Sequence, residues 1–188
     1  GARLYTTDGA AYLDCMAGIA VNALGHANPK LVQVLKDQAE KLWHVSNIFT
    51  IPGQEKLAKA LTDATFADVV LFTNSGTEAI ECAIKTARKH HWAKGAPERI
   101  DIIGFEGAFH GRTIAAVNAA GNPSYLEGFG PPLPGFVHLP FGDVDAIRKA
   151  IGPTTAAVLI EPVQGEGGAR SWPEAALTEI RRLCDEAG

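Results

Sequence analysis

The sequence is poor in cysteine, in basic residues and in long apolar runs. Its three cysteines, Cys15, Cys82 and Cys184, stand far apart, with neither a disulfide framework nor the paired spacing of a metal site. The 17 basic residues are outnumbered by 21 acidic ones and form no block, so nucleic-acid binding through a basic patch is not expected. No apolar run approaches the roughly 20 residues of a spanning helix. We therefore expect a protein of the reducing cytoplasm, with no metal, no nucleic acid and no membrane partner.

The composition is that of an ordinary globular protein. The chain has 188 residues, of which 46% are hydrophobic and 20% charged, which suits one domain or a large part of a bigger one. It opens inside a strand-and-turn unit, "RLYTTDGAAYLDC", and closes on the helical "EAALTEIRRLCDEAG". An alternating pattern would continue with another strand, so we expect the front portion of a longer enzyme.

Local patterns predict secondary structure along the whole chain. Asp8-Gly9 indicates a hairpin over 4–15, and Pro29 and Pro52 begin two helical patterns. From residue 68 onward, strand and helix patterns alternate, which is typical of a mostly parallel α/β sheet flanked by helices. We predict strands over 68–73, 99–105, 135–140 and 155–162, helices over 76–93, 113–120, 143–151 and 174–188, and a long loop over 121–135.

Three loops follow the carboxyl ends of predicted strands, where α/β sheets bind ligands. In the first, Ser75, Gly76 and Thr77 begin a helix, and a helix N-terminus offers unpaired N–H groups to an anion. Ser75 and Glu78 also have the spacing of a capping box, which local sequence favours and which is compatible with an anion site. The chain has no G-x-x-x-x-G-K-[ST] motif, so a nucleotide P-loop is not supported.

The other two loops carry an aromatic ring, a guanidinium and two carboxylates. Phe109 and His110 offer a flat face, and Arg112 can grip a carboxylate, although a core ring, a local hydrogen bond and a surface charge would explain the same residues. Glu161 and Glu166 flank a glycine-rich turn and are either acid–base groups, partners of an arginine or exposed loop carboxylates. Taken together, the three loops suit a phosphorylated aromatic cofactor and a carboxylate substrate, and pyridoxal 5'-phosphate is the economical candidate.

Longer motifs point to one family. The stretches "DCMAGIAVNALGHANP", "NSGTEAIECAIKTAR", "GAFHGRT", "GFGPPLPGFVHLPF" and "IEPVQGEGG" resemble the class III (ω-amino acid) aminotransferases, in order and at matching spacing across essentially all 188 residues. The resemblance implies fold type I of the pyridoxal-phosphate enzymes, with residues 1–45 belonging to a smaller domain and 46–188 forming the first part of the large cofactor-binding domain. It also implies a homodimer with active sites at the subunit interface.

The resemblance assigns roles to the loop residues. Ser75, Gly76 and Thr77 would bind the cofactor phosphate, Phe109 would stack on the pyridine ring with His110 beside it, and Glu161 would lie near the cofactor. Arg112 would bind the substrate α-carboxylate, and Glu166 matches the glutamate that pairs with a switchable arginine. The catalytic lysine of the family, which tethers the cofactor and moves the proton, lies further along the family's chains. None of the nine lysines here has the matching context, so we expect no catalytic residue within these 188 residues and no activity from them alone.

Within the family, the likeness is greatest to members acting on N-acetylornithine. The implied reaction is a ping-pong transfer of its terminal amino group to 2-oxoglutarate, giving glutamate, in arginine biosynthesis. Ile19 and Thr50 stand where ornithine-specific members place tyrosines, which favours an acylated substrate over ornithine. Ornithine, succinylornithine and succinyl-diaminopimelate remain alternatives, as do another fold type I enzyme, such as a decarboxylase or aminomutase, and a non-catalytic fragment.

Overall fold

The computed structural model describes residues 1–46 and 48–188. These fall into two compact units, Gly1–Val70 and Leu71–Gly188. Within the described residues, no helix is long and apolar enough to cross a bilayer. The predicted division into a smaller domain over 1–45 and a large domain over 46–188 stays a prediction.

The Gly1–Val70 unit contains a hairpin and two helices, all three predicted from the sequence. Strands β1 (Arg3–Tyr5) and β2 (Ala11–Leu13) pair antiparallel, and Gly9 takes a left-handed φ of 90° in the turn between them. Helix α1 (Pro29–Ala39) begins after Asn28, whose side chain accepts from the Lys30 N–H, and helix α2 (Pro52–Ala64) follows. Proline suits the first turn of both helices because the N–H that it lacks has no intrahelical partner there.

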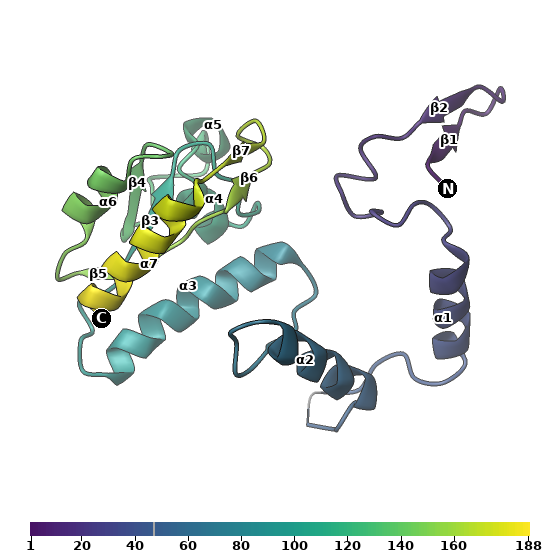
Figure 1. The fold of residues 1–188 in the computed structure, drawn as a ribbon, viewed down its shortest axis with the longest axis horizontal. Coiled ribbons are helices and arrows are strands. Elements are labelled where there is room, and N and C mark those ends of the chain that lie inside the picture. Colours follow the sequence, from purple (N-terminus) through teal and green to yellow (C-terminus); the bar gives the residue numbers. More distant parts are fainter. Residues whose placement is uncertain (47) are drawn as a thin grey trace. The chain divides into compact units, whose positions relative to one another are not determined.

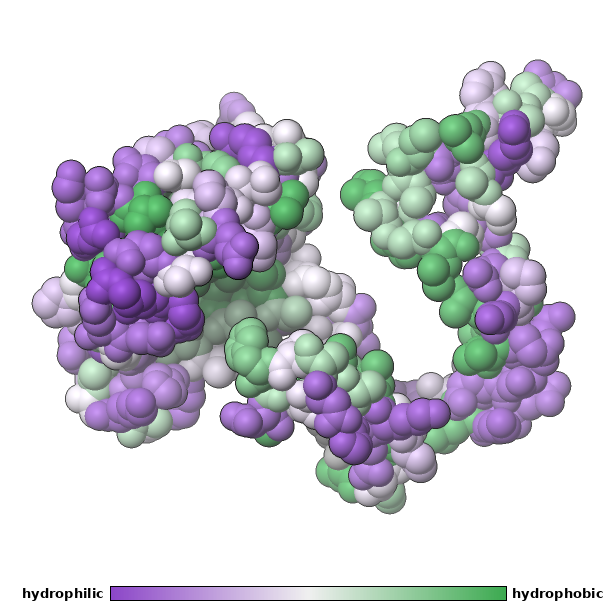
Figure 2. Space-filling view, viewed as in Figure 1, coloured by the Kyte–Doolittle hydropathy of each residue, from purple (hydrophilic) through white to green (hydrophobic). Residues whose placement is uncertain are grey.

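The loop between β2 and α1 is organised by one carboxylate. Asp14 Oδ1 accepts from the N–H groups of Met16 and Ala17, and Oδ2 lies 2.6 Å from His26 Nε2. The hydrogen bond to His26 is the main reason that the pKa of Asp14 lies below its usual value. Large apolar side chains nevertheless stay exposed in this unit, including Ile19 at 84% and Val21 at 81% (Figure 2).

The Leu71–Gly188 unit is built on a parallel sheet. Strand β3 (Asp101–Phe105) lies between β4 (Phe136–Leu139) and β5 (Thr155–Val158), parallel to both (Figure 1). These strands were predicted, with longer ends. A second, two-residue pairing of β6 (Val163–Gln164) with β7 (Arg170–Ser171) was not predicted, because that stretch reads as a loop.

Helices cover both faces of this sheet, and successive residues of β3 alternate between the faces. Ile103 and Phe105 pack with helices α6 (Val144–Ala150) and α7 (Glu174–Ala187), whereas Ile102 packs with α3 (Gly76–Ala93) and α4 (Ile114–Ala120). At Gly104 a Cβ would lie 2.5 Å from the Ala119 carbonyl oxygen, so glycine lets the backbone of α4 contact the strand directly. The expected α/β architecture, a parallel sheet flanked by helices, is confirmed.

Two local expectations need correction. The predicted strand over 68–73 is wrong: among the described residues no strand pairs with this segment, and Val69 and Leu71 are 84% and 71% exposed. An apolar β-branched run becomes a strand only where a neighbouring strand supplies the ladder hydrogen bonds. The expected loop over 121–135 contains one short helix, α5 (Pro123–Leu126), capped by Asn122.

Candidate functional site

The first turn of α3 is a helix cap with a reciprocal hydrogen bond. Ser75 has extended backbone angles, and its Oγ accepts from the Glu78 N–H at 3.2 Å. The Asn74 N–H in turn donates to the Glu78 carboxylate at 2.6 Å, whereas in the standard capping box the donor is the N–H of the cap residue itself, one position later. The sequence-predicted cap is therefore present, and it fixes where the helix begins.

The same turn has unused hydrogen-bond donors. Within the described part of the chain, the N–H groups of Gly76 and Thr77 have no acceptor, as expected for the first residues of a helix. A Cβ at Gly76 would meet nothing within 4 Å, so the space beside these groups is open. The positive end of the helix dipole adds to their attraction for an anion. Cap and anion site are thus compatible here, and this turn can hold a phosphate.

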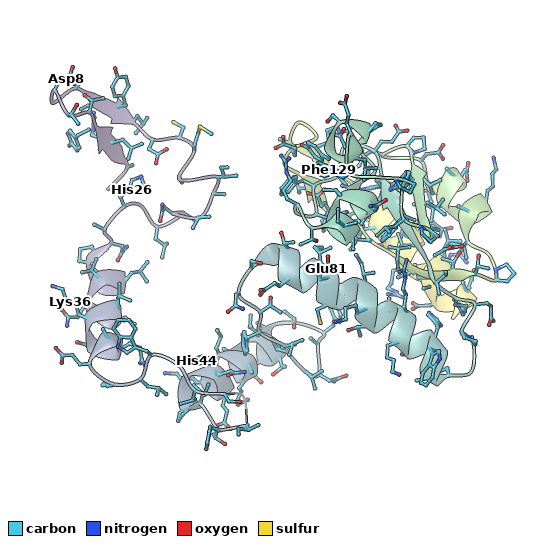
Figure 3. The ribbon with its side chains drawn as sticks, turned by 180° about the vertical axis from the view of Figure 1, so that it is seen from behind. Asp8, His26, Lys36, His44, Glu81 and Phe129 are labelled. Carbon is cyan, nitrogen blue, oxygen red and sulfur yellow. The ribbon has the colours of Figure 1, made fainter. Side chains whose placement is uncertain are left out.

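A close contact joins this turn to the loop after β3. Gly111 has a φ of 116°, and a Cβ placed on it would lie 2.2 Å from Thr77 Oγ1. Two residues further along that loop, the Thr113 hydroxyl donates to the carboxylate of Glu81, which lies in the first half of α3 (Figure 3). The structure therefore brings Ser75–Thr77 and Phe109–Arg112 together, although 31 residues lie between Thr77 and Phe109 in the sequence.

Phe109 is tied to the loop after β5. Its backbone N–H donates to Glu161 Oε2 at 3.0 Å, which gives this strand-end carboxylate a partner. The ring is 39% exposed. The hydrogen bond to Glu161 fixes the Phe109 backbone and leaves the ring free of polar contacts. An accessible ring beside a helix N-terminus can stack on a flat ligand that carries a phosphate.

Arg112 presents a guanidinium with free donors. Its Cζ lies 4.2 Å from the centre of the Tyr125 ring and 5.7 Å from that of Phe109. In residues 1–46 and 48–188, no carboxylate or carbonyl group accepts a hydrogen bond from it. A guanidinium that is packed on rings but unpaired at its N–H edges is suited to binding a carboxylate from solution.

His110 lies beside this site but is buried. Its side chain is 5% exposed, and its Nε2 has no hydrogen-bond partner among the described residues. Burial lowers the pKa of His110 from its usual value of 6.5; the charge on His138 acts in the same direction, and a hydrogen bond with the Phe109 backbone opposes both. The imidazole is therefore held neutral rather than offered as a cation.

The β6–β7 turn packs against the loop after β3 through residues that the sequence analysis missed. Gln164, which is 1% exposed, donates to the Glu106 carbonyl oxygen at 3.1 Å and accepts from Arg170 Nη2 at 2.7 Å. Arg170 also donates to the Glu106 oxygen, and a Cβ at Gly167 would lie 2.7 Å from the Gly107 oxygen. These contacts join two of the three strand-end loops, and only the glycines gave a signal for them in the sequence.

Glu166 occupies that turn and is exposed. In the part of the chain that the structure describes, no hydrogen bond or ion pair links its carboxylate to Phe109, Arg112 or Ser75. The structure thus places Glu166 on a turn that is fixed against the site, with its carboxylate free. The described residues contain no cluster of three or more side chains able to hold a metal ion.

Comparison with known proteins places this arrangement in a family. The profile of "Aminotransferase class-III" matches residues 1–188. The chain is 70% identical to acetylornithine aminotransferase 2 of Caulobacter vibrioides over 100% of this chain and 47% of that protein. It is 62% identical to the acetylornithine aminotransferase of Agrobacterium fabrum, over 99% of this chain and 47% of that protein. The chain therefore spans about half the length of the curated relatives it matches.

Solved structures agree with the sequence comparison. The ornithine aminotransferase from Toxoplasma gondii superimposes with a TM-score of 0.93 at 32% identity, covering 100% of this chain and 45% of that one. A thermostable (S)-enantioselective omega-transaminase from Thermomicrobium roseum gives a TM-score of 0.92 at 34% identity, with 100% and 48% covered. The expected fold type I architecture is confirmed. The chain belongs to the class III aminotransferases.

Proposed function

We propose that the whole protein carrying this chain is a pyridoxal-phosphate-dependent aminotransferase. It transfers the terminal amino group of N-acetylornithine to 2-oxoglutarate, a step of arginine biosynthesis. Relatives named acetylornithine aminotransferase, at 60–70% identity over nearly all of this chain, support the substrate. The single observation that carries the proposal is the contact of Thr77 with Gly111, which sets a helix N-terminus beside a loop bearing an exposed ring and a free guanidinium.

The residues at this position fit pyridoxal phosphate. The unpaired N–H groups of Gly76 and Thr77, with the open space beside Gly76, would hold the phosphate, and the exposed Phe109 face would stack on the pyridine ring. Glu161 and His110 keep that loop in place, Glu161 through the Phe109 N–H and His110 through its burial. When bound, the cofactor supplies the electron sink of the reaction.

Arg112 and Glu166 are proposed to bind substrate. The free N–H edges of Arg112 suit the α-carboxylate that N-acetylornithine and 2-oxoglutarate share. Glu166, exposed and unpaired within the described residues, suits the role of a carboxylate that pairs with an arginine when the amino donor is bound and releases it for the second carboxylate of 2-oxoglutarate. One pocket would then accept both substrates in turn.

The proposed preference for an acylated donor rests on Ile19 and Thr50. Neither side chain offers the phenol hydroxyl that a free α-amine would need, and Ile19 is 84% exposed on the loop organised by Asp14. An acetyl group masks that amine and removes its charge. Ornithine, succinylornithine and succinyl-diaminopimelate are the competing donors that the test must include.

We infer a cytoplasmic homodimer. Three free thiols, Cys15, Cys82 and Cys184, suit a reducing compartment. The exposed apolar side chains of the Gly1–Val70 unit, Ile19 and Val21 among them, suit burial against other polypeptide, as a subunit interface would provide. Size-exclusion chromatography with light scattering on the whole protein tests the dimer directly.

One assay tests the function. The purified whole protein, loaded with pyridoxal phosphate, is given 2-oxoglutarate and each candidate donor in turn, and glutamate formation is followed. We expect the highest kcat/KM with N-acetylornithine. A higher value with ornithine would overturn the substrate, and no glutamate with any donor would overturn the aminotransferase assignment.

A further inference from the structure

The long segment over 121–135 places one aromatic ring on the proposed substrate arginine. Arg112 Cζ lies 4.2 Å from the centre of the Tyr125 ring, closer than its 5.7 Å to Phe109. Both distances are within the roughly 6 Å at which a guanidinium is attracted to a ring face. Tyr125 is not among the residues proposed to bind the cofactor or the substrate.

Hydrogen bonds fix the start and the end of the segment that carries this ring. Asn122 Oδ1 accepts from the Ser124 N–H and hydroxyl, which starts the single turn of α5 that carries Tyr125. At the far end of the segment, the Leu133 N–H donates to Oδ1 of the buried Asn118 at 2.7 Å. The segment is thus capped at its start by Asn122 and hydrogen-bonded to α4 near its end through Leu133, and Tyr125 itself is half-buried.

Packing against a ring face leaves a guanidinium able to bind. All five N–H donors of arginine lie in the plane of the group, so a ring beneath that plane restricts the side chain without using a donor. A carboxylate or a carbonyl partner would hold Arg112 equally well, but would occupy the edge that a substrate needs. Among the described residues Arg112 has no such partner.

We propose that Tyr125 is a positioning residue for substrate binding, holding Arg112 by its ring face so that the N–H edge meets a carboxylate. The inference rests on the proposed role of Arg112. Because the ring contacts the guanidinium, which would bind substrate and take no part in the proton transfer, loss of the ring should raise KM and leave kcat unchanged. Both substrates present a carboxylate to Arg112, so KM should rise for both.

The test compares three variants of the whole, cofactor-loaded protein. Tyr125→Leu keeps apolar bulk but removes the ring, Tyr125→Phe keeps the ring but removes the hydroxyl, and Arg112→Ala removes the guanidinium. Trp92→Ala is the matched control. It also removes a cation–π contact, in which Lys89 Nζ lies 3.6 Å from the centre of the Trp92 ring, but this contact lies at the C-terminal end of α3, at the opposite end of the helix from Ser75–Thr77. Steady-state kinetics with N-acetylornithine and 2-oxoglutarate are combined with calorimetric binding of glutarate, an unreactive dicarboxylate.

We expect Tyr125→Leu to raise both KM values and the glutarate Kd about two- to fivefold at unchanged kcat, as loss of one cation–π contact predicts. Tyr125→Phe should restore the wild-type values. Equal effects of Leu and Phe would overturn the ring-face argument, as would wild-type binding in Tyr125→Leu beside weakened binding in Arg112→Ala. Wild-type binding in Arg112→Ala would instead remove the proposed role of Arg112, and this inference with it.

Discussion

At the scale of single residues, His110 makes stability depend on pH. Its pKa is lowered in the folded protein, mainly by burial, from 6.5. Well above pH 6.5 both the folded and the unfolded imidazole are neutral, and the native state has its full stability. As pH falls below 6.5, the unfolded state binds a proton that the folded state does not, so the free energy of unfolding decreases until pH passes the folded pKa.

The variant His110→Gln isolates this contribution, because glutamine does not titrate. We expect the difference in free energy of unfolding between the wild-type whole protein and the variant to be constant well above pH 6.5. Below that pH the wild type should lose stability faster. Urea unfolding at closely spaced pH values measures the difference, and parallel curves through this range would contradict the burial of a neutral imidazole.

Gly107 tests the contact between the two strand-end loops. Its φ is 80°, and a Cβ would lie 2.4 Å from Arg170 Nη2 and 3.1 Å from Gln164 Oε1. Gly128 is the matched control, with a φ of 81° and nothing within 4 Å. Gly128→Ala should lower the free energy of unfolding by about 1 kcal/mol, because alanine disfavours the left-handed backbone that this position requires. Gly107→Ala should lower the free energy of unfolding by about 1–2 kcal/mol more than Gly128→Ala, because the added Cβ would displace Arg170 and Gln164, which donate to the Glu106 oxygen.

Urea midpoints of the two glycine variants, measured on the whole protein, give the comparison. An equal loss in both would mean that Arg170 moves aside freely and that the contacts between Gln164, Arg170 and Glu106 add little. A larger loss in Gly107→Ala would show that these polar contacts help to fix the loop that carries Phe109.

The contrast between predicted and missed residues has a physical basis. Ser75, Phe109 and Glu161 were predicted together because the carboxyl ends of parallel strands meet at one edge of a sheet. Gln164 and Tyr125 were missed because their roles come from partners far away in sequence, Glu106 and Arg112, and no local pattern encodes such a contact.

At the scale of elements, helices were easier to predict than strands. The helices α1, α2 and α3 satisfy their hydrogen bonds internally, so proline and cap residues sufficed to locate their starts. A strand depends on its neighbour, and the run over 68–73 has none within the described residues. Two-residue strands such as β6 and β7 are too short for any period-2 pattern.

Substitutions at Ser75 separate the helix cap seen in the first turn of α3 from the phosphate site proposed there. Ser75→Ala should remove the hydrogen bond to the Glu78 N–H and lower the free energy of unfolding by about 1 kcal/mol. Ser75→Asp should keep the cap and the stability, because aspartate is an equally good N-cap residue. Its carboxylate would, however, oppose a phosphate at the neighbouring N–H groups.

We therefore expect Ser75→Asp to weaken binding of pyridoxal phosphate to the whole protein at least about tenfold while leaving the urea midpoint near that of the wild type. Fluorescence titration of the apo protein with the cofactor measures the affinity. Tight cofactor binding in Ser75→Asp would show that the turn is a cap alone and that the phosphate lies elsewhere.

At the scale of the whole molecule, these 188 residues contain the proposed cofactor and substrate contacts, but none of their lysines has the context of the family's tethering lysine. The nine lysines lie outside the three strand-end loops, at positions 30, 36, 41, 56, 59, 85, 89, 94 and 149. The proposed phosphate site at the α3 N-terminus and the proposed stacking on Phe109 would be non-covalent contacts, so the 188-residue chain alone should bind pyridoxal phosphate reversibly. Prolonged dialysis should then remove the absorbance of the cofactor completely.

The whole protein treated in parallel is the control, and it should keep its cofactor through the same dialysis because a lysine tethers it. Inorganic phosphate should compete with the cofactor for the 188-residue chain, since both would use the N–H groups of Gly76 and Thr77. Cofactor absorbance that survives dialysis of the 188-residue chain would reveal a covalent attachment to one of its nine lysines. That result would contradict the proposal that this chain binds the phosphate, the ring and one carboxylate by non-covalent contacts only.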